Sequence, residues 1–173
     1  MNIPNILTVL RFILIPVFGY HLFTGEYKTA ILLFMLSGLT DILDGYIARK
    51  FDMITPWGKL ADPLADKLMQ ITALVLLTMQ QRIPVVILII VIIKELFMAI
   101  GSILLYKKQN FVVSANWYGK MATIIFYFAI IIIIVFDLSN LLNNIFISIA
   151  VLSTLFAFYM YTLSYRRISG ISK

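Results

Sequence analysis

Six long apolar runs, separated by short polar segments, dominate the chain. They cover residues 6–23, 29–48, 60–79, 84–106, 117–136 and 141–163. An α-helix of about 20 apolar residues crosses the hydrocarbon core of a bilayer, and long apolar runs of this kind are read as membrane helices. With 62% apolar residues overall, the pattern predicts an all-α protein, an integral membrane bundle of six transmembrane helices, in a single domain over residues 1–173.

Basic residues mark every second connection between the runs. The alternate connections hold only Lys28 and Arg82. The other connections, with their flanks and the carboxyl-terminal end, hold Arg49, Lys50, Lys59, Lys107, Lys108, Lys120, Arg166, Arg167 and Lys173. By the positive-inside rule, both termini and the connection between the second and third runs face the cytoplasm of a multi-pass protein of the cell membrane. The net charge of +6 fits attraction to anionic lipids, and we expect no nucleic-acid partner.

Half of the eight acidic residues fall at or inside the second and third runs, as Asp41, Asp44, Asp62 and Asp66. Acidic side chains at membrane depth normally face a protein interior or a wet cavity and mark a substrate or ion site. Residues three and four apart share a helix face, so two adjacent helices can direct all of these carboxylates into one gap. At separations of ~6 Å and an effective dielectric of about 20, each ionised pair repels by roughly 3 kcal/mol. Cations or protons must therefore compensate the charge.

The composition of the chain narrows the choice of cation. There is no cysteine, and the single His21 lies far from the aspartates. Carboxylate ligands without Cys or His favour hard cations such as Mg²⁺ or Mn²⁺, and four aspartates suffice to hold a pair of ions at the spacing used in phosphoryl transfer. We therefore expect two divalent cations, Mg²⁺ or Mn²⁺, bound by Asp41, Asp44, Asp62 and Asp66.

Small residues and an arginine lie in register with the acids. Gly45, Ala48 and Gly58 leave a groove where larger side chains would block a ligand, and Arg49 offers a planar guanidinium suited to a phosphate. Together with two metal ions, this arrangement would suit a diphosphate. The alternatives are that the small residues serve helix packing and that Arg49, followed by Lys50, is a cytoplasmic anchor.

The first run and the residue before it contribute three further candidates. Asn5, Thr8 and Arg11 follow at three-residue spacing and would line a wall of the same cavity, where they could contact the acceptor or a phosphate. The alternative is that Asn5 and Thr8 cap the helix while Arg11 snorkels to the interface.

Later runs add two lysines. Lys94 and Glu95 interrupt the fourth run, and because consecutive helix residues do not face each other, at least one of them should find a partner on another helix. We expect Lys94 to point at an anionic group in the cavity, with Glu95 as a structural counter-ion. Lys120, near the cytoplasmic start of the fifth run, would meet a phosphate or anchor the helix at the interface.

The acids and their neighbours form one continuous pattern, which reads D-x-x-D-G-x-x-A-R, eight residues, then G-x-x-x-D-x-x-x-D. This pattern resembles the signature of the CDP-alcohol phosphatidyltransferase family at every fixed position, namely Asp41, Asp44, Gly45, Ala48, Arg49, Gly58, Asp62 and Asp66. The resemblance implies that a CDP-linked lipid, CDP-diacylglycerol, binds between the helices that carry the motif. An alcohol would then displace CMP to make a phosphodiester.

The resemblance also implies roles for individual residues. Asp41, Asp44 and Asp62 would bind divalent ions, while Asp66 would bind the second ion and act as general base toward the incoming hydroxyl. The CDP moiety would lie against the remaining motif residues, Gly45, Ala48, Arg49 and Gly58. A homodimer is a further expectation from the family.

The acceptor alcohol has two interpretations. Polar residues of the first, fourth and fifth runs are similar to those of bacterial phosphatidylglycerophosphate synthases, whose acceptor is glycerol 3-phosphate, and we favour this acceptor. The segment from Leu36 to Arg49 is also similar to cardiolipin synthases, whose acceptor is phosphatidylglycerol. A divalent-ion or proton-coupled transporter is an alternative of another class, but a transporter needs no Gly, Ala and Arg in register with its acids.

Overall fold

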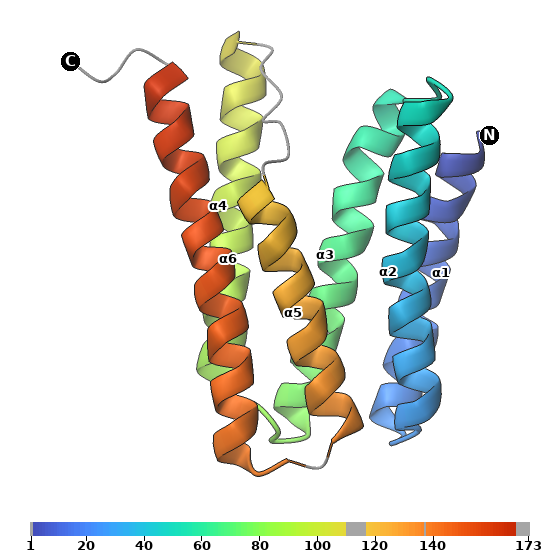
Figure 1. The fold of residues 1–173 in the computed structure, drawn as a ribbon, viewed down its shortest axis with the longest axis vertical. Helices are drawn as coiled ribbons and strands as arrows, with labels where there is room; N and C mark the ends of the chain where they lie inside the picture. Colours follow the sequence, from blue (N-terminus) through green and yellow to red (C-terminus); the bar gives the residue numbers. More distant parts are fainter. Residues whose placement is uncertain (1, 110–116, 137, 169–173) are drawn as a thin grey trace. The chain divides into compact units, whose positions relative to one another are not determined.

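The structure is a computed structural model that describes residues 2–109, 117–136 and 138–168. These residues form six α-helices, labelled in Figure 1: α1 (Ile3–Phe23), α2 (Tyr27–Lys50), α3 (Pro56–Met79), α4 (Val85–Gln109), α5 (Trp117–Val135) and α6 (Asn140–Ile168). Each predicted apolar run coincides with one helix, so the all-α prediction is confirmed. Among the basic residues used to predict the topology, Lys173 lies outside the described residues, as do the side chains of Lys59, Lys107, Lys108, Arg166 and Arg167.

Four of the helices are long and apolar enough to cross a membrane, namely α1, α2, α5 and, over Asn140–Leu163, α6. The helix α3 is as long as α2, but its first half carries several charged residues, Lys59, Asp62, Asp66 and Lys67. In the described residues, four of the six predicted transmembrane helices are therefore candidate membrane spans by length and composition. Membrane crossing by α3 and α4 stays a prediction.

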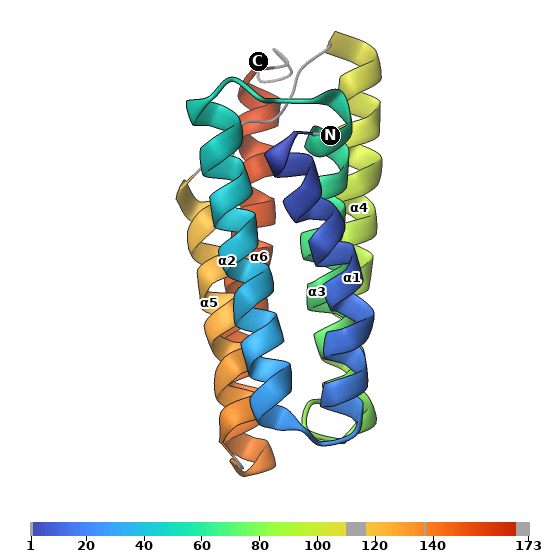
Figure 2. The same cartoon turned by 90° about the vertical axis from the view of Figure 1, so that its right-hand side faces the viewer.

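The chain divides into two compact units. The first unit spans Met1–Gln80 and contains α1, α2 and α3, and the second spans Gln81–Lys173 and contains α4, α5 and α6. Within the first unit, α1 packs against both α2 and α3, as Figure 1 and Figure 2 show from two sides. All motif residues from Asp41 to Asp66 belong to this first unit.

The buried face of α1 changes character along its length. It is formed at three- and four-residue spacing by Pro4, Thr8, Arg11, Leu14, Phe18 and Leu22. The later half is apolar, and the ring of Phe18 packs against Phe34 of α2 with 5.3 Å between the ring centroids. The earlier half is polar, and burial of Thr8 and Arg11 requires polar partners. The polar site of the first unit therefore lies toward the amino-terminal end of α1.

A hydrogen-bonded cap fixes the start of α3 against α1. The Thr55 hydroxyl accepts a hydrogen bond from the Gly58 backbone N–H at 2.9 Å and donates to Asn5 Oδ1 at 2.9 Å. Pro56 begins the helix, where its missing N–H has no cost. Because the cap joins the first turn of α3 to Asn5, it sets where the acids of α3 lie along α1.

The second unit is built around the close packing of α5 and α6. Tyr118 and Ala122 of α5 form a small buried cluster with Ala157 of α6. The rings of Tyr118 and Tyr161 meet edge to face, with centroids 5.1 Å apart. Gly119 makes this approach possible, because a Cβ at that position would collide with the Tyr161 hydroxyl.

Candidate active site

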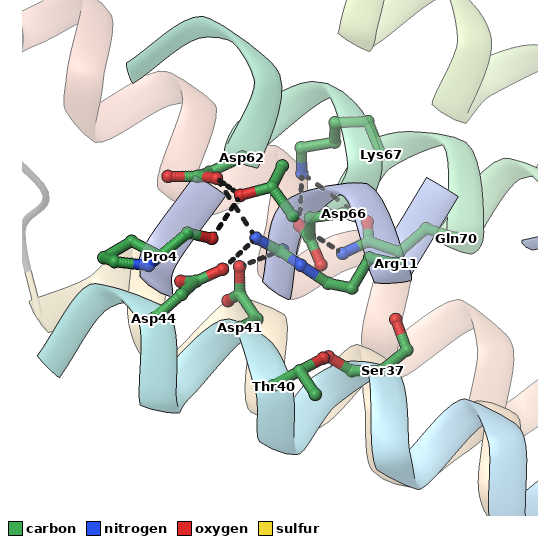
Figure 3. Close-up of polar contacts among 11 residues, drawn as sticks. Pro4, Arg11, Ser37, Thr40, Asp41, Asp44, Asp62, Asp66, Lys67 and Gln70 are labelled. Carbon is green, nitrogen blue, oxygen red and sulfur yellow. Dashed lines mark hydrogen bonds and ion pairs between the residues drawn. The ribbon is translucent and has the colours of Figure 1, made fainter. Parts of the chain in front are cut away.

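Acidic side chains from two helices gather at one place in the first unit. Asp41 and Asp44 lie on α2, Asp62 and Asp66 lie on α3, and Arg11 of α1 reaches between them (Figure 3). We call these five residues the carboxylate cluster. The cluster joins all three helices of the unit, so its geometry depends on how these helices pack.

Arg11 occupies the centre of the carboxylate cluster. Its guanidinium pairs with Asp41 through Nη1 and with Asp44 through Nη2, and Nη2 also lies 3.3 Å from Asp62 Oδ1. The Arg11 side chain is only 1% exposed. A planar guanidinium offers several N–H donors in a fixed fork, so this single cation bridges the two helices that carry the motif.

Arg11 also offsets part of the negative charge of the four aspartates. The carboxylate of Asp44 is 2% exposed, whereas Asp41 and Asp62 are 39% and 32% exposed. Asp44 therefore depends most on the guanidinium, since burial of an unpaired charge is very costly. The alternative that Arg11 snorkels to the interface is wrong, because its side chain is buried among the acids.

Thr8 lies one turn before Arg11 on the same face of α1. Its hydroxyl donates to Asp62 Oδ1 and lies 3.0 Å from the carbonyl oxygen of Pro4. The alternative that Asn5 and Thr8 cap α1 is wrong, because α1 begins at Ile3 and both residues lie inside the helix. Asn5 instead contacts the cap of α3, and Thr8 holds Asp62 in place.

Gly58 is a close-packing position beside Asp62. A Cβ at Gly58 would lie 3.0 Å from Thr55 Oγ1, 3.2 Å from Asn5 Oδ1 and 3.6 Å from Asp62 Oδ2. The two shorter distances are tighter than ordinary van der Waals contact. The structure thus accounts for the glycine through packing, and its contact with the CDP moiety stays a prediction.

Substitution of Gly58 by alanine is expected to destabilise the protein by about 1 kcal/mol, because the added methyl group displaces the Thr55 cap. Thermal unfolding in detergent would measure the loss. The matched control is Gly101→Ala on α4, where no described atom lies within 4 Å of the added Cβ. That variant should gain up to about 1 kcal/mol from helix propensity. Equal stability of the Gly58→Ala variant and the unmodified protein would contradict the packing role.

Arg49 lies back over Gly45, one helical turn earlier on α2. A Cβ at Gly45 would lie 3.5 Å from Arg49 Nη2 and 3.6 Å from Nη1. Arg49 is exposed, and Ala48 is half-buried. A second guanidinium therefore lies within about one turn of Asp44, where it can meet a phosphate, although the assignment of these residues to the CDP moiety stays a prediction.

Asp66 has partners of its own on α3. The Gln70 Nε2 donates to Asp66 Oδ2 at 2.9 Å, and Lys67 Nζ lies 4.0 Å from the same oxygen and 3.5 Å from Gln70 Oε1 (Figure 3). The Gln70 side chain is 4% exposed. Gln70 was not predicted from the sequence, where its signal is an amide residue one helical turn after an acid.

The four aspartates of the carboxylate cluster suit a hard divalent cation, because they offer carboxylate oxygens as ligands. In the described part of the chain, no group of three or more His, Cys, Asp or Glu side chains is arranged to hold a metal ion. The guanidinium of Arg11 pairs with both Asp41 and Asp44. A divalent ion would therefore share these carboxylates with Arg11 or replace it.

The two lysines predicted as phosphate contacts belong to the second unit. Lys94 is 6% exposed and pairs with Oε1 of the adjacent Glu95 at 2.6 Å. This ion pair agrees with the expectation that Glu95 is a counter-ion. The expectation that one of the two residues has a partner on another helix stays a prediction. Lys120 is exposed in the first turn of α5. Binding of a phosphate by Lys94 or Lys120 stays a prediction.

The sequence matches the profile described as CDP-alcohol phosphatidyltransferase over residues 1–156. The chain is 31% identical over 170 residues to the CDP-diacylglycerol–glycerol-3-phosphate 3-phosphatidyltransferase of Aquifex aeolicus, an alignment that covers 94% of this chain and 95% of that enzyme. The enzyme of the same name from Bacillus subtilis is 34% identical over 137 residues, or 70% of each chain. The one from Pseudomonas fluorescens is 48% identical over 83 residues, which cover 46% of this chain and 43% of that enzyme.

The family match extends across both units and includes every position of the motif. The Aquifex aeolicus enzyme aligns with almost the whole chain, so the likeness is not confined to the acids. Local identity is higher over the shorter Pseudomonas fluorescens alignment. The chain therefore belongs to the CDP-alcohol phosphatidyltransferase family.

Proposed function

We propose that this protein transfers the phosphatidyl group of CDP-diacylglycerol to glycerol 3-phosphate and releases CMP. The observation that carries the proposal is the presence of the complete family motif on two packed helices, with its acids around Arg11. Similarity over 94% of the chain to an enzyme named for this reaction supports the choice of acceptor. The protein is thus an enzyme of anionic phospholipid biosynthesis.

Family members use divalent metal ions, and we assign two of them, as Mg²⁺ or Mn²⁺, to Asp41, Asp44, Asp62 and Asp66. Bound there, the ions would neutralise the diphosphate and stabilise the charge on the transferring phosphoryl group. The cytidine diphosphate would lie against Gly45, Ala48, Arg49 and Gly58. The exposed guanidinium of Arg49 would pair with a phosphate oxygen.

The transfer is a direct displacement at phosphorus. Asp66 accepts the proton from the hydroxyl group of glycerol 3-phosphate, and the hydroxyl oxygen forms a bond to the phosphorus of the phosphatidyl group. The bond from this phosphorus to the bridging oxygen of the diphosphate breaks, and CMP leaves with that oxygen. The reaction replaces a phosphoanhydride linkage by a phosphate ester linkage and requires no protein nucleophile.

The phosphate of the acceptor needs its own cationic partner. Three candidates from the sequence lie on α1, namely Asn5, Thr8 and Arg11. Their described contacts are with Thr55 and with the acids of the carboxylate cluster. We therefore assign these residues to holding the acids in place. Lys94 and Lys120 remain our candidates for the acceptor phosphate.

We also infer that all six helices cross the cell membrane and that both units act as one domain over residues 1–173. The motif flanks the connection between α2 and α3, where Arg49 and Lys50 favour a cytoplasmic location. The active site would then face the cytoplasm, where glycerol 3-phosphate, a charged water-soluble acceptor, can reach it. A homodimer stays a prediction from the family resemblance.

An acceptor assay tests the proposed function. The protein is purified in detergent and supplied with CDP-diacylglycerol and Mg²⁺. It should release CMP when glycerol 3-phosphate is added, and the lipid product should carry the phosphate of the phosphatidyl group and the phosphate of the acceptor. Parallel reactions contain phosphatidylglycerol, inositol phosphate or serine. Formation of cardiolipin from phosphatidylglycerol would show that the acceptor is phosphatidylglycerol and not glycerol 3-phosphate. No CMP release with any acceptor, together with ion flux in liposomes, would favour a transporter.

A further inference from the structure

Gln70 is buried and contacts the proposed general base, yet the reaction described so far assigns it no role. We propose that Gln70 is a positioning residue that orients the carboxylate of Asp66, and that Lys67 fixes the orientation of the Gln70 amide. The inference rests on the proposed function, because that function makes Asp66 the base. It concerns a contact that lies outside the family motif.

The hydrogen bond between Gln70 and Asp66 joins two side chains one helical turn apart. Gln70 Nε2 lies 2.9 Å from Asp66 Oδ2, and Gln70 is 4% exposed. The terminal torsion of an aspartate is broad and weakly restricted, so a carboxylate without such a contact samples many orientations. A donor held by packing removes this freedom and fixes the plane of the Asp66 carboxylate.

Lys67 determines which end of the Gln70 amide faces Asp66. A glutamine amide has an accepting oxygen and a donating nitrogen, whereas an ammonium group can only donate. Lys67 Nζ lies 3.5 Å from Gln70 Oε1 and 4.0 Å from Asp66 Oδ2. Reversal of the amide would place its nitrogen toward the ammonium and its oxygen toward the carboxylate, and both contacts would repel. The favourable orientation of the Gln70 amide therefore has its oxygen toward Lys67 and its nitrogen toward Asp66.

Orientation of a base matters because the reacting atoms must approach in a narrow range of distance and angle. A displacement of about 1 Å can lower a rate by about 10²-fold. Partners that orient site carboxylates and ligands typically change activity by about 10- to 100-fold when they are removed. The cost of losing Gln70 should fall on the chemical step, since Gln70 contacts the base and not a proposed substrate group.

The first test is Gln70→Met, which keeps an unbranched side chain of similar length but removes the donor. We expect kcat for CMP release to fall at least about 10-fold, with KM for CDP-diacylglycerol and glycerol 3-phosphate changed by less than about two-fold. The matched control is Gln80→Met, directly after the end of the same helix. It removes the hydrogen bond from Gln80 Nε2 to the Leu22 carbonyl oxygen at 2.7 Å. This control should retain its kcat.

The second test is a double-mutant cycle with Lys67→Met. If Lys67 acts through the amide, Lys67→Met lowers kcat in the native background but by less than about two-fold in the Gln70→Met background. Additive losses would overturn the role of Lys67. Unchanged kcat in Gln70→Met, or a loss equal to that of Gln80→Met, would overturn the role of Gln70.

The outcomes separate this inference from the proposed function. If the unmodified protein and Gln80→Met release no CMP, the proposed function fails. If both are active and Gln70→Met is equally active, only the positioning role fails. If Gln70→Met does not fold, Lys67→Met at its partly exposed site must lower kcat with unchanged KM, and a native kcat in that variant would overturn the inference.

Discussion

Replacement of Asp66 by asparagine is expected to lower kcat by about 10²- to 10⁴-fold, the usual contribution of a general base, while the protein stays folded. Asparagine keeps the shape of the side chain, and its oxygen can still accept the hydrogen bond from Gln70. The amide cannot take up the proton of the acceptor hydroxyl, and it is a weaker ligand for a hard cation. CMP release at saturating substrates and Mg²⁺ measures the loss, and thermal unfolding in the same detergent verifies the fold.

The matched control for this variant is Asp52→Asn. Asp52 is exposed in the connection between α2 and α3, with a φ of 51°, and asparagine tolerates that left-handed backbone well. The control should keep its activity and stability. Activity of Asp66→Asn within about 10-fold of the unmodified protein would remove Asp66 as the base, since a general base contributes more than this.

The helices were predictable from the sequence because their apolar runs are long and their connections are short. The acids of α2 and α3 were predictable as one group for a similar reason, since three- and four-residue spacing fixes which side chains share a face. Spacing within one helix does not determine which helix that face meets. The pairing of Asp41 and Asp44 with Arg11 is therefore a property of the packed unit.

Two other contacts, each made by a single pair of side chains, also could not be predicted from spacing along the sequence. The ion pair of Lys94 with Glu95 depends on rotamers that bring neighbours together around a helix, and helix phase alone does not exclude it. The contact of Gln70 with Asp66 has the right spacing, but one polar residue in an apolar run carries no distinctive pattern. In both cases burial makes the polar contact necessary, and burial is known only from the packed structure.

Replacement of Arg11 by methionine is expected to cause the largest loss of stability in the first unit, about 3 to 5 kcal/mol, the usual cost of breaking a buried ion pair. Arg11 is 1% exposed and Asp44 is 2% exposed, so the variant leaves a buried carboxylate beside two others without its cation. Thermal unfolding in detergent without divalent metal measures the loss. Arg11→Lys should be intermediate, because an ammonium group cannot bridge several carboxylates with the fixed fork of a guanidinium.

The matched control is Arg82→Met, which also replaces an arginine by methionine. A described partner of Arg82 is the Ile133 carbonyl oxygen, which lies 2.8 Å from Nη1. We expect it to lose less than Arg11→Met, about 1.5 to 3 kcal/mol, the usual value of a hydrogen bond to a charged group. Mg²⁺ should stabilise Arg11→Met more than the unmodified protein, because the added cation replaces the missing charge among the acids. Equal stability of Arg11→Met and Arg82→Met, with equal responses to Mg²⁺, would mean that the carboxylates do not depend on Arg11. The charge balance of the site would then have to come from elsewhere.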